Sequence, residues 1–257
     1  MTSAYEKVIN ARSQNRLKAS DYLDFLFDDF IELHGDRNFK DDPSIIAGIA
    51  SFNKKPVTVI AQAKATNLEE NLRRNFAMTS PSGYRKAIRL AKEAEKFQRP
   101  VIFLIDTPGA YPGIEAENNG QANAIAQCLK VFSDLNTITI ALVISEGGSG
   151  GALAFSVVDC LLMNENAVYS ILSPEGFASI LFKDESKASQ AAELMELTAI
   201  DLLEKKVIDE IISEKHNPLK NAYLAIDSNL QRLEKIKMKN LLNKRYQKFR
   251  KLGNVYD

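Results

Sequence analysis

The stretch TITIALVISEGGSGGALAFSVV, residues 137–158, decides the fold class. Residues 137–145 form an apolar, β-branched run of the kind found in strands that are buried on both faces. The glycine-rich turn EGGSGG follows at 146–151, and ALAFSVV at 152–158 predicts a helix. A strand, a tight turn and a helix in this order indicate an α/β protein with functional loops at the ends of its strands.

The same alternation covers the centre of the chain. We expect a hairpin of two apolar strands, then a helix, a buried strand and a second helix, at 45–52, 57–63, 81–97, 101–106 and 121–132. Two further short apolar runs, CLLM and AVYSIL, begin at Cys160 and Ala167. Ser173-Pro174-Glu175 then predicts another helix, with serine as its cap and proline in the first helical position.

The flanking segments are less regular. Ser20 predicts the cap of a helix whose apolar residues recur near helical spacing until Gly35 ends it. Residues 64–80 are polar and too long for a simple connection, which indicates a functional or mobile loop. The tail 229–257 carries nine Lys or Arg residues, two acidic residues and a helical apolar stripe. This tail is either the solvated basic face of a terminal helix or a contact for an acidic partner or a phosphate.

Composition narrows the class of protein. The chain has 257 residues, with 33 Lys and Arg against 33 Asp and Glu, so bulk charge does not suit a nucleic-acid binder. Two cysteines are too few for a disulfide framework or a four-thiolate zinc site. No apolar run approaches the length of a membrane span, and the N-terminus does not resemble a signal peptide. We therefore expect a cytoplasmic enzyme.

Two glycine-rich turns are the candidate site. The first, DTPGAYPG at 106–113, follows a buried strand directly, and the second, EGGSGGA at 146–152, joins a strand to a helix. Free backbone N–H groups with no side chains in the way predict an anion or oxyanion site. The alternative is that the glycines only allow close packing of helix and strand. A phosphate-binding loop is disfavoured because the Gly-Lys-Ser/Thr ending is missing.

A serine hydrolase is a second hypothesis. Gly147, Ser149 and Gly151 fit the pattern G-x-S-x-G between a strand and a helix. The two histidines of the chain, His34 and His216, are the candidate bases. A non-catalytic CoA- or nucleotide-binding module with the same fold is a third hypothesis.

Five stretches together closely resemble the α subunits of bacterial acetyl-CoA carboxylase carboxyltransferases. They are ELHGDR (32–37), SGYRKAIRLAKEAEKF (82–97), DTPGAYPG (106–113), EGGSGGALA (146–154) and SPEGFASILFKD (173–184). The resemblance implies an α/β, crotonase-like superhelix of β-β-α units with helical extensions at both ends. It places an N-terminal helical segment at 1–40, the carboxyltransferase core at 41–215 and a basic C-terminal helix at 216–257.

The resemblance also implies an activity and its partners. The family transfers a carboxyl group from carboxybiotin, tethered to the biotin carboxyl carrier protein, to acetyl-CoA, giving malonyl-CoA for fatty-acid synthesis. It implies an α2β2 assembly with a β subunit that carries zinc, and a link to the biotin carboxylase complex. No metal in this chain, no membrane and no nucleic acid in the catalytic role are expected.

The same resemblance assigns roles to the glycine turns. The backbone N–H groups of Gly150 and Gly151 are the expected oxyanion donors to the ureido oxygen of biotin. Gly109 and Ala110 are expected to form the other side of the biotin site. The remaining residues expected on the carboxybiotin side are Gly147, Gly148 and Ala152.

Overall fold

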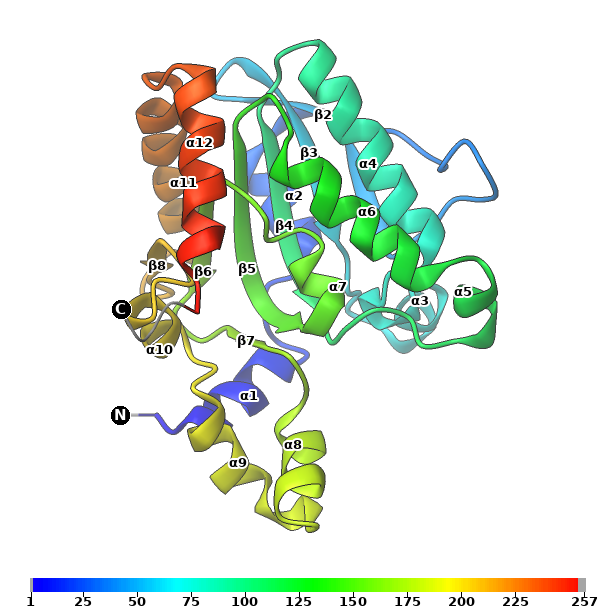
Figure 1. The fold of residues 1–257 in the computed structure, drawn as a ribbon, viewed down its shortest axis with the longest axis vertical. Coiled ribbons are helices and arrows are strands. Elements are labelled where there is room, and N and C mark those ends of the chain that lie inside the picture. The colour runs from blue at the N-terminus through cyan, green and yellow to red at the C-terminus, as the bar shows by residue number, and fades with distance from the viewer. Residues whose placement is uncertain (1, 254–257) are drawn as a thin grey trace.

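The computed structural model describes residues 2–253, and its centre is an eight-stranded mixed sheet (Figure 1). The strands are β1 (Asp28–Glu32), β2 (Ile45–Phe52), β3 (Lys55–Gln62), β4 (Val101–Thr107), β5 (Thr139–Gly148), β6 (Cys160–Asn164), β7 (Val168–Ser170) and β8 (Glu210–Ile212). Their order is β1-β2-β3-β4-β5-β6-β8, and β7 pairs with the end of β5. β1, β2 and β3 are antiparallel, whereas β3, β4, β5, β6 and β8 run parallel.

The parallel strands are buried on both faces, as their apolar runs predict. Every residue of β4 is buried, and Phe103 lies in register with Ile60 of β3 and Ala141 of β5. Because the carboxyl ends of parallel strands meet at one edge of a sheet, the segments that follow β3, β4 and β5 are brought together there.

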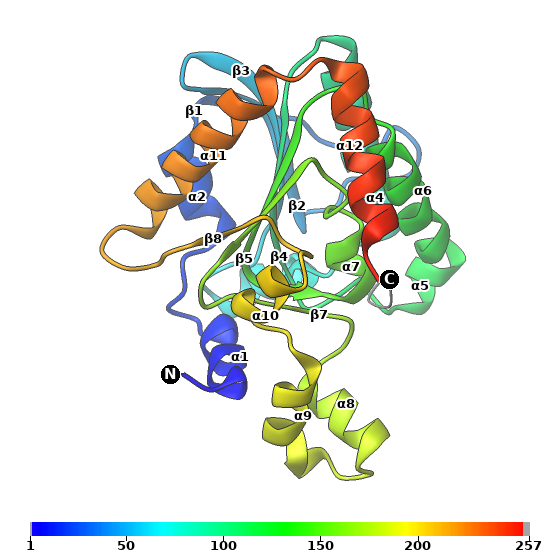
Figure 2. The same ribbon diagram turned by 60° about the vertical axis from the view of Figure 1, so that its left-hand side comes forward.

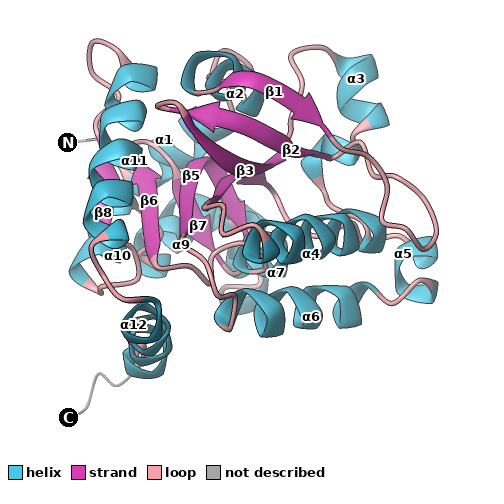
Figure 3. Cartoon of the chain, turned by 90° about the horizontal axis from the view of Figure 1, so that it is seen from above, coloured by secondary structure: helices cyan, strands magenta, loops and turns pink. Residues whose placement is uncertain are grey.

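Helices cover both faces of the sheet (Figure 3). The long helices α4 (Pro81–Lys96) and α6 (Gln121–Ser133) bury their apolar sides on one face. On the other face lie α2 (Ala19–Leu26) and α11 (Pro218–Glu234), with the start of α12 (Met238–Lys251). The short helices are α3 (Leu68–Arg73), α5 (Ile114–Asn118), α7 (Ser149–Leu153) and α10 (Ala199–Glu204), with 3-10 turns at 75–77 and 185–187.

A two-helix arm projects from this body (Figure 2). It consists of α8 (Pro174–Leu181) and α9 (Ala188–Met195), and α1 (Ala4–Arg12) packs against α9. Ser173 caps α8 by accepting the N–H of Gly176 at 3.1 Å, so the predicted helix start is confirmed. No helix among residues 2–253 combines the length and the apolar character that a bilayer span requires.

The hairpin of β2 and β3 is confirmed as predicted. Phe52 pairs with Lys55, and the two residues between them, Asn53 and Lys54, have φ of 49° and 62°. Positive φ at both central positions is typical of a type I′ turn, whose twist matches that of the flanking strands.

The predicted helix from Ser20 to Gly35 is wrong in its second half. α2 ends at Leu26, and residues 28–32 form β1, so the segment 1–40 is not wholly helical. β1 pairs with the edge of β2, where Ile31 lies opposite Ile49. This pairing overrides the helical spacing of the apolar residues. The helix also begins earlier than predicted, because the Asp21 carboxylate accepts the N–H of Lys18 at 2.6 Å.

Two other predicted elements differ from the structure. Residues 64–80, predicted as a functional or mobile loop, contain α3 and a 3-10 turn. The helix predicted through Val158 ends at Leu153, since the ring of Phe155 turns into the core and stacks on Phe103 at 5.6 Å. Burial of two aromatic rings favours this turn over another helical residue.

The C-terminal region 216–257 contains two helices rather than one. α11 and α12 are separated at 235–237, and the prediction for 254–257 lies outside the described residues. Arg245 of α12 is buried, and its guanidinium binds Asp159 at 2.7 and 2.8 Å. It also donates to the carbonyl oxygens of Phe132, Leu135 and Thr137 at 2.8–2.9 Å. One cation of the basic tail therefore joins α12 to the body.

Arg245→Met should lower the free energy of unfolding by about 3–5 kcal/mol, because it leaves the buried Asp159 carboxylate without its cation. Lys244→Met on the exposed side of α12 is the matched control and should change stability by less than about 0.5 kcal/mol. Urea denaturation measures both. Equal effects of the two substitutions would contradict the role assigned to Arg245.

Candidate active site

The two glycine turns touch each other through their backbones. A Cβ atom on Gly148 would lie 2.1 Å from the carbonyl oxygen of Pro108. A Cβ atom on Gly151 would lie 2.5 Å from the carbonyl carbon of Gly109 and 2.7 Å from the nitrogen of Ala110. Glycine at 148 and 151 is therefore required for the two turns to approach this closely.

Gly150 differs from these two glycines because a side chain there would not clash with backbone atoms of the first turn. A Cβ atom there would meet nothing closer than Ile125, at 3.7 Å. Beside it lies a hollow of about 400 Å³, lined by Ser149, Gly150, Leu153, Tyr169, Ser170, Ile171, Leu202 and Val207. The N-cap of α7 is Gly148, and no side chain caps the first turn of this helix. No side chain therefore competes with a ligand for the first-turn N–H groups.

Polar side chains set the shape of the first turn. Thr107 accepts the N–H of Gly109 at 3.1 Å and donates to the carbonyl oxygen of the same residue at 2.7 Å. Ala110 pairs with Thr79 in an isolated parallel bridge, and the N–H of Tyr111 donates to the Thr79 carbonyl at 3.1 Å. The amide of Gln121 donates to the carbonyl oxygens of Thr79 and Tyr111, both at 2.9 Å. Residues from three separate segments of the chain thus hold the first turn in place.

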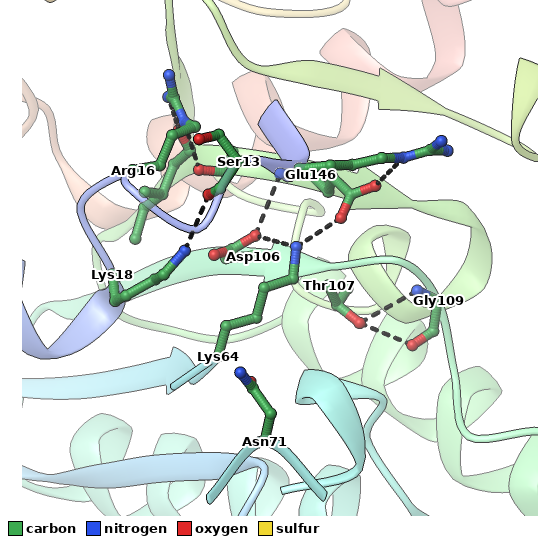
Figure 4. A network of polar contacts seen from close by, with 12 residues as sticks. Ser13, Arg16, Lys18, Lys64, Asn71, Asp106, Thr107, Gly109 and Glu146 are labelled. Atoms are coloured by element: carbon green, nitrogen blue, oxygen red, sulfur yellow. Dashed lines mark hydrogen bonds and ion pairs between the residues drawn. The ribbon is translucent and has the colours of Figure 1, made fainter. Parts of the chain in front are cut away.

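A charge network lies directly behind both turns (Figure 4). The Nζ atom of Lys64 is 2.9 Å from Asp106 and 2.5 Å from Glu146. Glu146 also binds Arg12 of α1 at 3.0 Å, and Arg12 reaches Glu175 at the start of α8 at 2.8 Å. Asp106 and Glu146 are the first residues of the first and second glycine turns.

Burial and charge oppose each other in this network. Burial acts to raise the pKa of Glu146, but Lys64 and Arg12 outweigh it and lower that pKa below its ordinary value. Burial likewise acts to lower the pKa of Lys64, and the charges of Asp106 and Glu146 raise it. Glu146 and Lys64 are therefore both charged at neutral pH, and each compensates the charge of the other.

The structure brings the predicted site residues into one region. Gly109, Ala110, Gly148 and Gly151 form the contact between the turns, and Gly150 borders the hollow. A Cβ atom on Gly147 would clash with the ring of Tyr169 at 2.6 Å. Ala152 is fully buried in the core. The roles of Gly150 and Gly151 as oxyanion donors stay predictions.

Ser149 lies at the strand–helix turn with φ of 52°, in the left-handed region. The candidate base His34 contacts the carboxylate of Asp41, at 2.9 Å from its ring nitrogen Nδ1. In residues 2–253 no hydrogen bond joins Ser149 to His34 or His216. A serine nucleophile needs such a base within reach.

Among residues 2–253, no group of three His, Cys, Asp or Glu side chains is placed to bind a metal ion.

The charge network was not predicted from the sequence, although a signal for it exists. Lys64, Asp106 and Glu146 each lie at or just beyond the carboxyl end of one of three neighbouring strands. One cation and two acids at the same sheet edge predict an ion-pair cluster once the strand order is known. Arg12 had no such signal, because its contact joins residues 134 positions apart.

Solved structures share this fold. The fold matches a transcarboxylase 12S chain, with methylmalonyl-coenzyme A and methylmalonic acid bound, at a TM-score of 0.74 and 16% identity over 90% of this chain. It spans only 45% of that chain, about half its length. A Pseudomonas malonate decarboxylase hetero-tetramer in complex with coenzyme A matches at a TM-score of 0.65 and 15% identity, covering 79% of this chain and 84% of that chain. The predicted crotonase-like fold of carboxyltransferases is thereby confirmed.

Sequence relatives then identify the family. Residues 1–253 match the family described as acetyl co-enzyme A carboxylase carboxyltransferase-like, and the chain belongs to this family. It is 52% identical to the acetyl-coenzyme A carboxylase carboxyl transferase subunit alpha of Clostridium botulinum (strain Alaska E43 / Type E3), over 99% of this chain and 96% of that protein. The subunit alpha of Streptococcus sanguinis (strain SK36) is 49% identical over 98% of this chain and 100% of its own length.

Gly148→Ala and Gly151→Ala should each lower the free energy of unfolding by about 1–3 kcal/mol, because the added methyl group meets backbone atoms of the first turn. Gly150→Ala is the matched control and should change stability by less than about 0.5 kcal/mol. Urea denaturation of the three variants measures the difference. Wild-type stability of Gly148→Ala would show that the two turns are not in backbone contact.

Proposed function

We propose that this chain is the α subunit of an acetyl-CoA carboxylase carboxyltransferase, and that it supplies the biotin side of the active site. The reaction is transfer of a carboxyl group from carboxybiotin to acetyl-CoA, which gives malonyl-CoA. The single observation that carries the assignment to this site is the pair of glycine turns, packed together with Gly150 facing the hollow. Membership of the carboxyltransferase family supports the reaction class.

The site fits the cofactor by shape and by chemistry. The hollow beside Gly150 is lined largely by apolar side chains, including Leu153, Tyr169 and Ile171, and can take a compact ring system. Carboxybiotin, when bound, supplies the carboxyl group, and negative charge develops on its ureido oxygen as that group leaves. Backbone N–H groups of Gly150 and Gly151 would donate to this oxygen without reorganisation.

The first turn completes the biotin side of the site. Gly109 and Ala110 lie against Gly151, and a side chain at 109 would meet nothing within 4 Å. Thr107, Thr79 and Gln121 keep this turn rigid, so its backbone presents a constant surface. A rigid arrangement of donors stabilises developing charge more than a mobile one does.

The remaining parts of the enzyme would come from partner proteins. The proposed partners are a zinc-bearing β subunit in an α2β2 assembly, the biotin carboxyl carrier protein and the biotin carboxylase complex. Ile171 and Leu153 at the rim of the hollow are 77% and 42% exposed, which suits a surface that a partner covers. Acetyl-CoA would be bound mainly by the β subunit.

The purified chain alone should form no malonyl-CoA, and activity should appear when the β subunit and a carboxylated biotinyl carrier domain are added. Activity should depend on the β subunit because the pair of glycine turns provides only the biotin side of the active site. A radiolabelled carboxyl-transfer assay measures it. Turnover by the isolated chain would contradict the proposed division of the active site.

Gly150→Val should reduce carboxyl transfer by the assembled enzyme about 10²-fold, the loss expected when an oxyanion donor is blocked. The substitution is expected to leave folding intact, since a Cβ atom at 150 would make only ordinary contact with the Ile125 side chain, at 3.7 Å, and would not meet the backbone of the first turn. Steady-state kinetics on complexes of verified assembly provide the measurement.

Ser149→Ala distinguishes this mechanism from the hydrolase. The variant should keep more than about a tenth of its activity, whereas loss of a serine nucleophile costs on the order of 10³-fold or more. Covalent labelling of Ser149 by a serine-directed probe would favour the hydrolase instead.

A further inference from the structure

The pairing of β4 and β5 changes register at the base of the glycine turns. Ile105 pairs with Val143, but the next pair is Thr107 with Gly147. A single β4 residue, Asp106, therefore lies opposite three β5 residues, 144–146. Such a bulge re-aims the chain that follows it. Here it directs the segment from Gly147 onward toward the first turn.

The side chain of Asp106 binds the backbone of β5 where the regular pairing of β4 with β5 is interrupted. Its Oδ1 atom accepts the N–H of Glu146 at 3.2 Å and the ammonium of Lys64 at 2.9 Å. The Asp106 side chain is only 1% exposed, so this carboxylate depends on protein partners. Lys64 is the cation that compensates its charge directly.

Lys64 connects the two turns because it binds both carboxylates at once (Figure 4). Asp106 begins the first turn and Glu146 begins the second. The side chains of Lys64 and Glu146 are 15% and 12% exposed, so screening by water is weak. Without Lys64 the two carboxylates would repel each other across the bulge, with only Arg12 bound to Glu146.

We propose that Lys64 is a positioning residue, and that its ammonium sets the separation of the two glycine turns by binding Asp106 and Glu146 together. The proposal deepens the proposed function and rests on it, because the separation places Gly109 and Ala110 relative to Gly150 and Gly151. Lys64 acts through the carboxylates and is not itself a donor to the reacting groups.

The assembled complex carrying Lys64→Met tests the proposal. Its kcat for carboxyl transfer should fall about 10²-fold at pH 8, the effect of a misplacement of about 1 Å, while KM for acetyl-CoA should change less than about threefold. Lys55→Met at the other end of β3, an exposed ion pair with Glu234, is the matched control and should leave kcat unchanged.

A second variant separates repulsion from simple loss of contacts. Asp106→Asn keeps an oxygen that can accept the N–H of Glu146 and removes one charge. The double variant Lys64→Met/Asp106→Asn should therefore recover at least about a third of the wild-type kcat. Activity of the double variant no higher than that of Lys64→Met, or wild-type kcat in Lys64→Met, overturns the proposal.

The pH profile provides a further readout. The charged groups facing the cluster are Arg12 from α1, Arg16 and Lys18 from the segment after it, Glu175 of α8 and Glu214 after β8. Lys64 and Arg12 lower the pKa of Glu146, so its stabilising effect is present at neutral pH and is lost as the pH falls through this pKa. In Lys64→Met the Glu146 carboxylate should take up a proton at higher pH than in the wild type.

The activity lost in Lys64→Met should thus be partly regained between pH 8 and pH 6, and an unchanged profile overturns the proposal.

Thermal unfolding gives a result independent of catalysis. At pH 8 the Tm of Lys64→Met should lie below that of the double variant, and the gap should close as the pH falls. A wild-type complex without carboxyl transfer would refute the proposed function, whereas an inverted order of Tm values would refute the pairing of charges.

Discussion

The backbone contact between the two glycine turns is the constraint on which the site depends. No side chain fits between Gly148 and the Pro108 carbonyl, or between Gly151 and residues 109–110. The contact leaves Gly150 facing outward beside the apolar hollow. Glycine is therefore required for packing at 148 and 151, whereas at 150 the proposed reason for glycine is access for biotin.

The sheet supplies the geometry that makes this contact possible. β3, β4 and β5 are parallel and end at one edge, and the bulge after Ile105 directs the second turn toward the first. Lys64, Asp106 and Glu146 compensate one another at that edge, so buried charge there is paired rather than isolated. Arg12 extends the network to α1 and, through Glu175, to the projecting arm of α8 and α9.

Local patterns in the sequence predict the centre of the fold well and its margins less well. The hairpin, α4, β4, α6 and the start of α8 follow from periodicity, caps and prolines, which act within a few residues. β1, the early end of α7 and the division of the tail into α11 and α12 depend on distant partners such as Ile49, Phe103 and Asp159. The glycine turns were found for the same local reason, whereas the contact between them and the Lys64 cluster required the strand order.

A structure of the α and β subunits assembled with a biotinyl carrier domain would show directly which groups contact the ureido oxygen of biotin. The ureido oxygen of biotin should lie about 2.7–3.1 Å from the backbone nitrogens of Gly150 and Gly151, the range expected for oxyanion donors. The ring should occupy the hollow lined by Leu153 and Ile171. Biotin bound elsewhere, with side chains rather than these N–H groups at its ureido oxygen, would contradict the account.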